Sequence, residues 1–267
     1  MSRIDVTFEH LSRQRRKALI PFFSVGDPDL ASCVPIMHAM VEGGANILEL
    51  GVPFSDPMAD GPTIQRSSER ALKNGVNLRQ VLEQVALFRQ QDTQTPVVLM
   101  GYANPIERMG LASFADACAK SGVDGVLVVD YPPDEAVGLS QLLKPLGLDS
   151  IFLISPTTTD DRMREIGELA TGYLYFVSLR GVTGAAHINP QEVTFQINRI
   201  RNHTAVPVGV GFGIRDGEMA RQLSQVADAV VVGSRIVEEI EANPVQEVPQ
   251  RVKALISRFR QTMDTTT

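Results

Sequence analysis

The chain has 267 residues, 43% of them hydrophobic, with 25 basic and 31 acidic side chains and a formal net charge of −6. This composition suits one large core, so we expect a single domain over residues 1–267 with a disordered tail at about 262–267. The sequence has no stripe of basic residues that would indicate nucleic acid or an anionic membrane as a partner. The absence of a long apolar stretch and of a signal peptide predicts a cytoplasmic protein.

Short apolar runs alternate with helix-period segments along the whole chain. The runs predict strands at 18–23, 46–50, 96–100, 125–129, 150–153, 173–177, 206–210 and 227–232. The segments between them predict helices at 29–42, 62–73, 78–90, 111–121, 134–144, 159–170, 189–202, 215–225, 234–242 and 245–260. Strands that are each followed by a helix indicate an α/β protein with a (β/α)8 TIM barrel and extra N- and C-terminal helices; a doubly wound open sheet is the alternative.

An acidic residue, Glu49, stands at the end of the apolar run 45–51. The period of two along a strand places Leu48 and Leu50 under the flanking helices and Ile47 and Glu49 inside the barrel. A buried carboxylate costs several kcal/mol unless it is paired, protonated or hydrated. We therefore expect Glu49 to be a functional acid, the alternative being a salt-bridged structural residue.

Further acids follow the strands on the C-terminal side. Asp60 lies in the long connection 51–61, and Asp130 ends the fourth predicted strand. The connections 51–61 and 179–188 exceed the usual loop length and fall on the face where barrel enzymes keep their chemistry. Asp60 and Asp130 are thus candidates for acid-base work, although aspartates at such positions often only cap helices or fix turns.

Glycines cluster after the last three predicted strands, at 181–184, 209–213 and 233. Glycine allows backbone amides to approach a ligand, and the positive end of a helix favours an anion. Since barrels often bind phosphate after strands seven and eight, we predict a phosphate site here. The alternative is that these glycines only form tight turns.

The residue types that are missing from the strand ends limit the kinds of reaction that the chain could catalyse. No lysine stands there to form a Schiff base, and no histidine or cysteine spacing predicts a metal, so we expect a chain with no metal and no cofactor of its own. The chemistry must then use carboxylates and the electronics of the substrate. An apolar and aromatic wall, suited to a flat substrate, is predicted from Phe22, Met100, Tyr102, Leu153, Tyr175 and Phe212.

The segment LELGVPFSDPMADGPTIQ at 48–65 resembles the signature of the tryptophan synthase alpha chain family. The resemblance extends from about residue 3 to 260. It includes PFFSVGDP at 21–28, MGYANPI at 100–106, YFVS at 175–178, GVTG at 181–184 and GVGFGI at 209–214.

The resemblance implies retro-aldol cleavage of indole-3-glycerol phosphate to indole and glyceraldehyde 3-phosphate. It implies that Glu49 protonates the indole ring, that Asp60 holds the indole N–H, and that Thr183 closes over the site and contacts Asp60. A phosphate cradle is implied at Gly184, Gly213, Gly233 and Ser234. The partner is a beta chain that carries pyridoxal phosphate in an alpha2beta2 tetramer and is faced by Asp56, Pro57 and Asn104.

Three departures from the family pattern stand out: Leu179-Arg180 before Gly181, Val129 before Asp130, and Arg235 after Ser234. Arg180 bears on loop closure and Arg235 on the charge near the phosphate, but neither removes a catalytic group. Two other functions remain open: a stand-alone indole-glycerol phosphate lyase without a partner, and a non-catalytic barrel that activates a beta chain.

Overall fold

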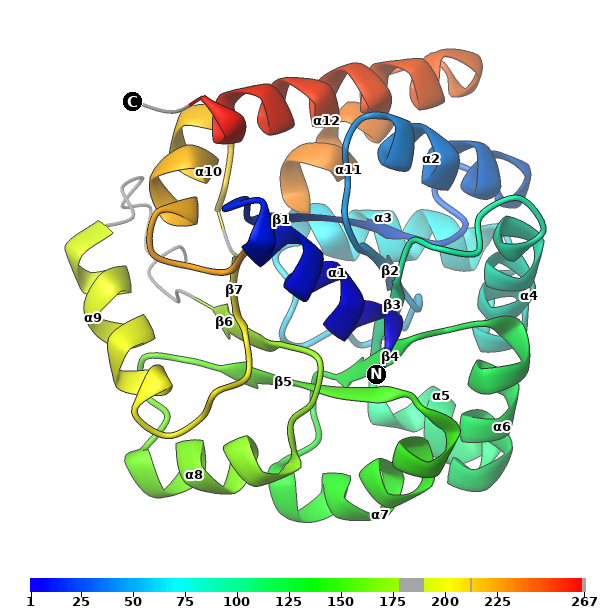
Figure 1. Cartoon of the computed structure of the whole chain (residues 1–267). Helices are drawn as coiled ribbons and strands as arrows, with labels where there is room; N and C mark the ends of the chain where they lie inside the picture. The colour runs from blue at the N-terminus through cyan, green and yellow to red at the C-terminus, as the bar shows by residue number, and fades with distance from the viewer. Residues whose placement is uncertain (178–189, 212, 266–267) are drawn as a thin grey trace.

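The computed structural model describes residues 1–177, 190–211 and 213–265. Its strands form one closed parallel barrel in the order β1 to β8, as Figure 1 shows. The barrel prediction is confirmed, and the doubly wound alternative is wrong. The strands are β1 Ala18–Ser24, β2 Leu48–Gly51, β3 Val97–Gly101, β4 Gly125–Val128, β5 Asp149–Ile154, β6 Leu174–Val177, β7 Val208–Gly211 and β8 Ala229–Val232.

Helices surround the barrel, and capping side chains start several of them. Asp29, Thr159 and Asp216 each accept a hydrogen bond from a first-turn amide. The helices are α1 Arg3–Arg13, α2 Leu30–Glu42, α3 Pro62–Lys73, α4 Leu78–Arg89, α5 Ala103–Met109, α6 Leu111–Ser121, α7 Pro133–Leu143, α8 Asp160–Leu169, α9 Pro190–Arg201, α10 Gly217–Ser224, α11 Ser234–Glu241 and α12 Val248–Asp264, with 3-10 turns η1 Lys144–Leu146 and η2 Val245–Glu247.

Two predictions at the level of elements were wrong. Helix α5 was not expected, because its seven residues are too few for a periodic signal. The tail begins later than 262, since α12 continues to Asp264. Arg16 and Arg260 both donate to the Asp264 carboxylate and so hold the last turn in place. Residues 266–267 lie outside the described part of the chain.

The interior of the barrel follows the predicted alternation. Ile47 belongs to the apolar cluster inside the barrel, whereas Leu48 and Leu50 pack with the core between barrel and helices. Glu49 pairs in register with Phe22 of β1 and Val98 of β3, and is itself buried. The sequence prediction that Glu49 lies inside the barrel is therefore confirmed.

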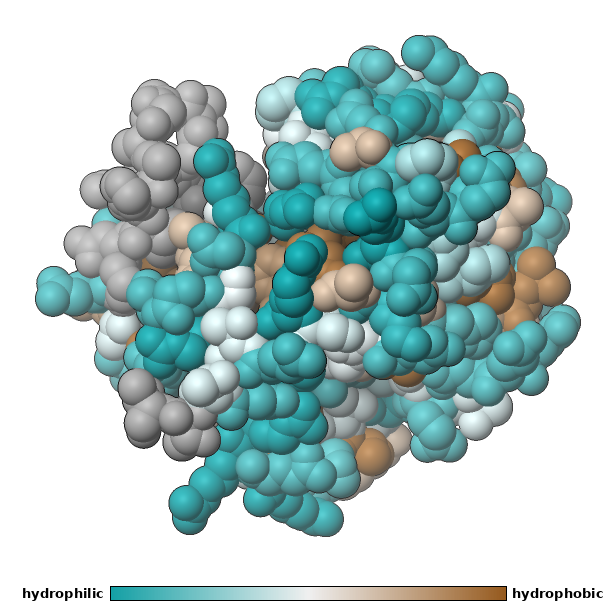
Figure 2. Space-filling model, turned by 90° about the horizontal axis from the view of Figure 1, so that it is seen from above, coloured by the Kyte–Doolittle hydropathy of each residue, from teal (hydrophilic) through white to brown (hydrophobic). Residues whose placement is uncertain are grey.

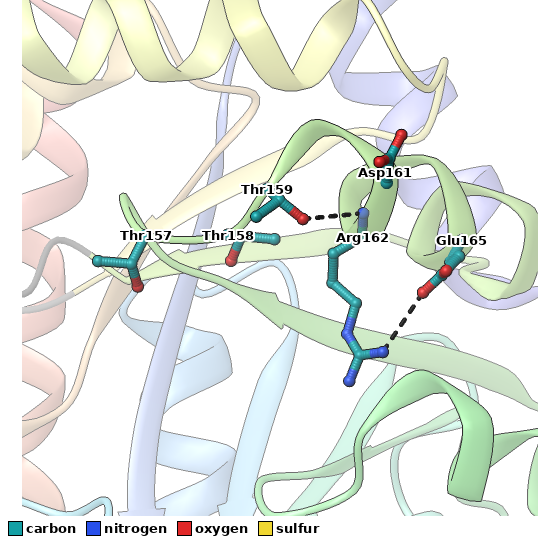
Figure 3. Close-up of a pocket in the computed structure, with 6 residues that line it drawn as sticks. All are labelled: Thr157, Thr158, Thr159, Asp161, Arg162 and Glu165. Atoms are coloured by element: carbon teal, nitrogen blue, oxygen red, sulfur yellow. Dashed lines mark hydrogen bonds and ion pairs between the residues drawn. The ribbon is translucent and has the colours of Figure 1, made fainter.

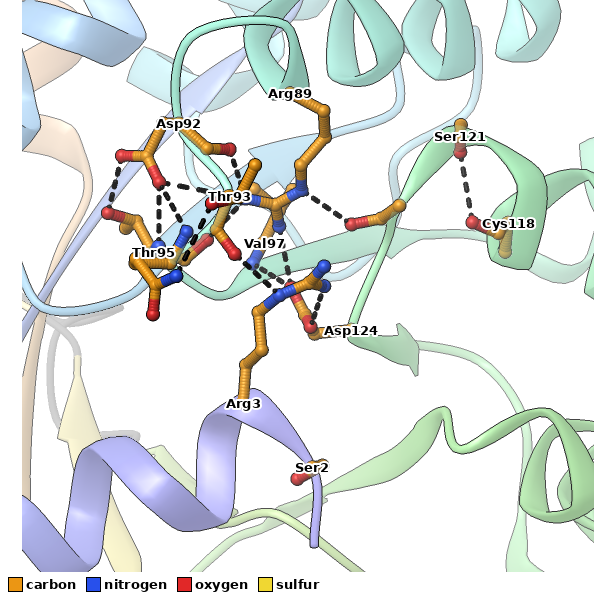
Figure 4. Close-up of polar contacts among 12 residues, drawn as sticks. Ser2, Arg3, Arg89, Asp92, Thr93, Thr95, Val97, Cys118, Ser121 and Asp124 are labelled. Atoms are coloured by element: carbon orange, nitrogen blue, oxygen red, sulfur yellow. Dashed lines mark hydrogen bonds and ion pairs between the residues drawn. The ribbon is translucent and has the colours of Figure 1, made fainter.

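Helix α1 is attached to the N-terminal end of the barrel. Ile4 and Leu11 join the interior cluster, and Arg3 donates to the buried Asp124 over 2.7 Å. Arg89, at the end of α4, donates to the other Asp124 oxygen, also over 2.7 Å. Figure 4 shows both guanidinium groups pointing at this carboxylate. The network closes the end of the barrel opposite to the predicted site.

On the outer side, α12 packs against α2, α10 and α11. Figure 2 shows a face on which hydrophilic residues predominate and hydrophobic residues are scattered. None of the helices in the described ranges is long and apolar enough to cross a membrane.

Candidate active site

Glu49 is held inside the barrel by strand β2, with 1% of its surface exposed. The Tyr173 hydroxyl donates to its Oε1 over 3.0 Å, while Oε2 has no hydrogen-bond partner among the described residues. No ion pair between described residues includes Glu49, which argues against a salt-bridged structural role. Burial raises the pKa of Glu49 to about 7, and the Tyr173 hydrogen bond opposes this rise. The group can therefore exchange a proton near neutral pH.

Asp60 ends a compact turn after β2. Its amide donates to the Pro57 carbonyl over 3.0 Å, and its own carbonyl accepts from the Gln65 side chain over 2.9 Å. Burial raises the pKa of Asp60 to about 6, while the Tyr102 hydroxyl lowers it. The carboxylate lines a small cavity together with Phe22, Ser24, Gly51, Val52, Ile64, Ser68, Met100, Gly101, Tyr102 and Val129.

The charges of both candidate acids, Glu49 and Asp60, act on Tyr175. Burial raises the pKa of its phenol well above the usual value, and the charges of Glu49 and Asp60 raise it further. A side chain at Gly211 of β7 would clash, because a Cβ there would lie 2.2 Å from the Tyr175 hydroxyl oxygen. Glycine at this position thus leaves room for the Tyr175 side chain.

Five of the six residues predicted for the apolar wall lie in the described part of the chain. Phe22 and Tyr102 are buried, Met100 and Leu153 pack against the interior cluster, and Tyr175 does the same. Gly51 leaves room for Phe22, since a Cβ there would lie 2.7 Å from the ring. Phe212 and Thr183 lie outside the described residues.

Ser24, Ile64 and Ser68 are among the residues that line the Asp60 cavity without having been predicted from the sequence as site residues. Ser24 follows Phe22 by two positions on β1, so the alternation along the strand could have indicated it. Ile64 and Ser68 lie on α3, one helical turn apart, and only the fold of the loop before α3 places them at the site.

The predicted phosphate residues lie at the ends of β7 and β8. Gly213 has a φ of 69°, a conformation that favours glycine. Gly233 is the N-cap of α11, whose first residue is Ser234. A Cβ on Gly233 would lie 3.4 Å from the Phe22 ring, so the start of α11 borders the apolar wall. Gly184 is outside the described residues.

Two of the three departures from the family pattern, Val129 and Arg235, lie in the described part of the chain. Arg235 donates to Glu239 one turn along α11, over 2.6 Å, which satisfies its charge on the helix itself. Val129 lines the Asp60 cavity. Leu179 and Arg180 lie outside the described residues.

Asp130 turns out to be a structural acid. It is exposed, and its carboxylate accepts from the Ala103 amide at the start of α5 over 2.8 Å. The helix-capping alternative raised for Asp130 from sequence therefore agrees with the structure.

The residues predicted to face a partner are accessible. Asp56 and Asn104 are exposed and Pro57 is half-buried. Next to them, Met58 exposes 85% of its surface, an unusual amount for a large apolar side chain. They lie in the segments after β2 and β3, near the Asp60 turn.

Another, more open pocket lies at the β5 to α8 connection. Thr157, Thr158, Thr159, Asp161, Arg162 and Glu165 line it. In Figure 3 the Arg162 side chain reaches Glu165, and Arg162 also lies 3.5 Å from Asp134. The charged side chains of this pocket thus pair largely with one another, and none of the predicted catalytic acids lines the pocket. Within the described residues no group of His, Cys, Asp and Glu could hold a metal ion.

Comparison with known proteins gives consistent matches. The family model described as tryptophan synthase alpha chain matches residues 8–266. The tryptophan synthase alpha chain of Dechloromonas aromatica (strain RCB) is 56% identical over 264 residues, covering 99% of this chain and 98% of the relative. That of Burkholderia mallei (strain NCTC 10229) is 57% identical over 259 residues, with coverages of 97% and 94%.

Solved structures agree with these relatives. The crystal structure of tryptophan synthase subunit alpha from Legionella pneumophila str. Paris superposes with a TM-score of 0.93 at 45% identity and covers 99% of each chain. A structure of tryptophan synthase from M. tuberculosis in its aminoacrylate-bound form gives a TM-score of 0.88 at 34% identity, covering 98% of this chain and 100% of the other.

Proposed function

The chain belongs to the tryptophan synthase alpha chain family, whose members are lyases that cleave indole-3-glycerol phosphate, and we propose that Glu49 and Asp60 perform this cleavage here. The observation that carries the proposal is the state of Glu49. It is buried without a cation in the described residues, and its pKa is raised to about 7. A carboxyl group of this kind can give and take a proton at neutral pH.

The proton transfers follow from the substrate. Protonated Glu49 gives its proton to the indole ring carbon that bears the glycerol chain, and the ring nitrogen takes up positive charge. Ionised Asp60 accepts the indole N–H and stabilises that charge. The bond between this ring carbon and the first carbon of the glycerol chain then breaks. The hydroxyl on that chain carbon loses its proton to Glu49, and the electrons of the broken bond return to the ring. Indole and glyceraldehyde 3-phosphate are the products, and Glu49 ends in its starting form.

Substrate binding uses the rest of the site. We assign the indole to the wall formed by Phe22, Met100, Tyr102, Leu153, Tyr175 and Phe212. The phosphate is assigned to Gly184, Gly213, Gly233 and Ser234, as the family resemblance implies. The start of α11 at Gly233 and Ser234 supports this, because the first amides of a helix lack partners within the helix and favour an anion. To Thr183 we assign the contact with Asp60 that the family resemblance implies.

Family membership implies a beta-chain partner. We propose an alpha2beta2 tetramer in which the beta chain binds pyridoxal phosphate and receives the indole, while this chain has no cofactor of its own. The exposure of Asp56, Asn104 and Met58 supports a docking face after β2 and β3. A phosphorylated substrate does not cross membranes freely, so we place the reaction in the cytoplasm.

The test is to incubate the purified chain with indole-3-glycerol phosphate, alone and with a beta chain, and to follow indole. Glu49→Gln should reduce cleavage by about 10² to 10⁴ while phosphate-ester binding persists, because the amide transfers no proton. Cleavage within threefold of the parent would refute the assignment of Glu49. Full activity that no beta chain increases would favour the stand-alone lyase, and no activity except activation of a beta chain would favour the regulatory barrel.

A further inference from the structure

Two contacts join Tyr102 to opposite ends of the turn that carries Asp60. At the near end, the Phe54 ring stacks on the Tyr102 ring with centroids 5.3 Å apart and an interplanar angle of 28°. At the far end, the Ala59 amide donates to the Tyr102 hydroxyl over 3.1 Å. Tyr102 is buried and directly follows β3, so a side chain held at the end of that strand touches both ends of a mostly exposed turn.

We propose that Tyr102 is a positioning residue that fixes the Asp60 turn against the barrel and so places the Asp60 carboxylate. This inference rests on the proposed function and goes beyond a place in the apolar wall. The ring holds the start of the turn through Phe54, and the hydroxyl holds the residue directly before Asp60. Among the described residues, the further backbone contacts of Asp60 are to Pro57 in its own turn and to Gln65, so the contacts of Tyr102 restrict where its carboxylate lies.

The electrostatics of the site agree with this geometry. The Tyr102 hydroxyl lowers the pKa of Asp60 against the effect of burial, and the charge of Asp60 in turn adds to the raised pKa of Tyr102. The other titratable groups in the described residues that face this pair are Tyr175, beside Asp60, and Asp130, beside Tyr102. None of these is a cation, so the hydroxyl is the contact that favours the ionised carboxylate.

The junction that holds Tyr102 is itself fixed. Tyr102 is the N-cap of α5, and the next amide, that of Ala103, is bonded to Asp130 after β4. Tyr102 thus follows β3 directly, contacts the turn after β2, and precedes a residue that is bonded to the acid after β4. Such a support restricts the turn more than a contact within the turn does.

The variants Tyr102→Phe and Phe54→Leu separate the two contacts. The first keeps the stacked ring and removes the hydroxyl; the second keeps the hydroxyl and removes the stack. Tyr131→Phe is the matched control, because Tyr131 stands after the neighbouring strand β4 and donates its hydroxyl to Glu107 on the surface, away from Asp60. All three are measured for kcat, KM and thermal midpoint in indole-3-glycerol phosphate cleavage.

We expect Tyr102→Phe to lower kcat up to about tenfold, the effect of one lost hydrogen bond, with KM within twofold. Asp60 should titrate at higher pH, so the acidic limb of kcat moves upward. Phe54→Leu should lower kcat without moving that limb, and Tyr131→Phe should change neither. If Tyr102→Phe behaves as Tyr131→Phe does, the inference is wrong. Should Tyr102→Phe fail to fold, an unchanged kcat in Phe54→Leu overturns it.

A second readout does not depend on catalysis. The carboxyl resonance of Asp60 in protein labelled with carbon-13 aspartate, identified by its loss in Asp60→Asn, reports the titration directly. A higher Asp60 pKa in Tyr102→Phe supports the inference even if the chain cleaves no substrate, in which case only the proposed function fails. An unchanged titration in a chain that is active overturns the inference alone.

Discussion

The Tyr173 hydroxyl of the β5 to β6 segment donates a hydrogen bond to Glu49 of β2 across the barrel interior, over 3.0 Å. Burial favours the neutral form of Glu49, and this hydrogen bond favours the charged form; burial has the larger effect, so the pKa rises to about 7. Glu49 is therefore partly protonated at neutral pH. Asp60, with a pKa raised only to about 6, is mostly ionised under the same conditions.

These two pKa values predict a bell-shaped pH profile for cleavage. Activity requires protonated Glu49 and ionised Asp60 in the free enzyme, so kcat/KM should fall below about pH 6 and above about pH 7. Tyr173→Phe removes the hydrogen bond that lowers the Glu49 pKa, which should move the alkaline limb to higher pH. Rate profiles of the parent, Tyr173→Phe and the surface control Tyr131→Phe test this. An alkaline limb that stays in place in Tyr173→Phe would show that another group controls it.

The same raised pKa predicts a pH-dependent stability. The folded-state pKa of Glu49 is above the ordinary 4.5, so folding favours the protonated form. The contribution to the free energy of unfolding is complete below about pH 4.5 and is lost as the pH rises through about 7. A difference of 2.5 pKa units, from 4.5 to 7, corresponds to about 3 kcal/mol.

Glu49→Gln should therefore be more stable than the parent at pH 8 and lose that advantage at pH 4.5. Urea unfolding of both proteins at the two pH values measures the difference. An equal difference at pH 4.5 and pH 8 would mean that Glu49 is not desolvated in solution as the structure has it.

Periodicity in the sequence predicted much of the fold. The alternation that placed Leu48 and Leu50 outside and Glu49 inside acts within a few residues, so one strand reveals it. Asp130 was ambiguous because its partner, the Ala103 amide, is 27 residues away and only the adjacent strand ends bring them together. Ser68 was missed for a similar reason: its helix reaches the site only through the turn at 52–61. The tail was misplaced because one partner of Asp264, Arg16, comes from the other end of the chain.

The Asp124 network at the N-terminal end of the barrel should contribute to stability and not to catalysis. Asp124 is buried and accepts from Arg3, Arg89 and the Val97 amide. Arg89→Met removes one partner of a buried ion pair, which should cost about 3 to 5 kcal/mol of unfolding free energy. The exposed pair of Arg13 and Glu9 offers a control, and Arg13→Met should cost less than about 1 kcal/mol. Unchanged kcat and KM in folded Arg89→Met would place the network outside the catalytic machinery; equal costs for both variants would contradict the prediction.

Asp60→Asn should impair catalysis more than substrate binding. The amide still reaches the indole N–H, but it lacks the charge that stabilises the positive ring in the transition state. We expect kcat to fall by about 10² or more with KM within a few-fold, in the range known for the loss of one electrostatic contact. Steady-state kinetics at pH 7 measure both constants. A change confined to KM would assign Asp60 to ground-state binding.

A beta chain should increase cleavage by this chain. The Asp60 turn carries Asp56 and Met58 on its exposed side, so a partner that binds there contacts the same short segment that places the catalytic carboxylate. Binding shifts the population toward the arrangement it fits best, and we expect kcat to rise at least about tenfold at saturation.

Met58→Ser should weaken complex formation while leaving the activity of the isolated chain within twofold, because Met58 is exposed and lines no part of the Asp60 cavity. Leu146→Ser, a surface control on the 3-10 turn η1 far from the turn in sequence, should leave both properties unchanged. Titration of each variant with a beta chain, followed by indole release and by a binding measurement, distinguishes the outcomes. If the beta chain binds and cleavage does not change, the turn transmits nothing and the stand-alone lyase becomes the better description.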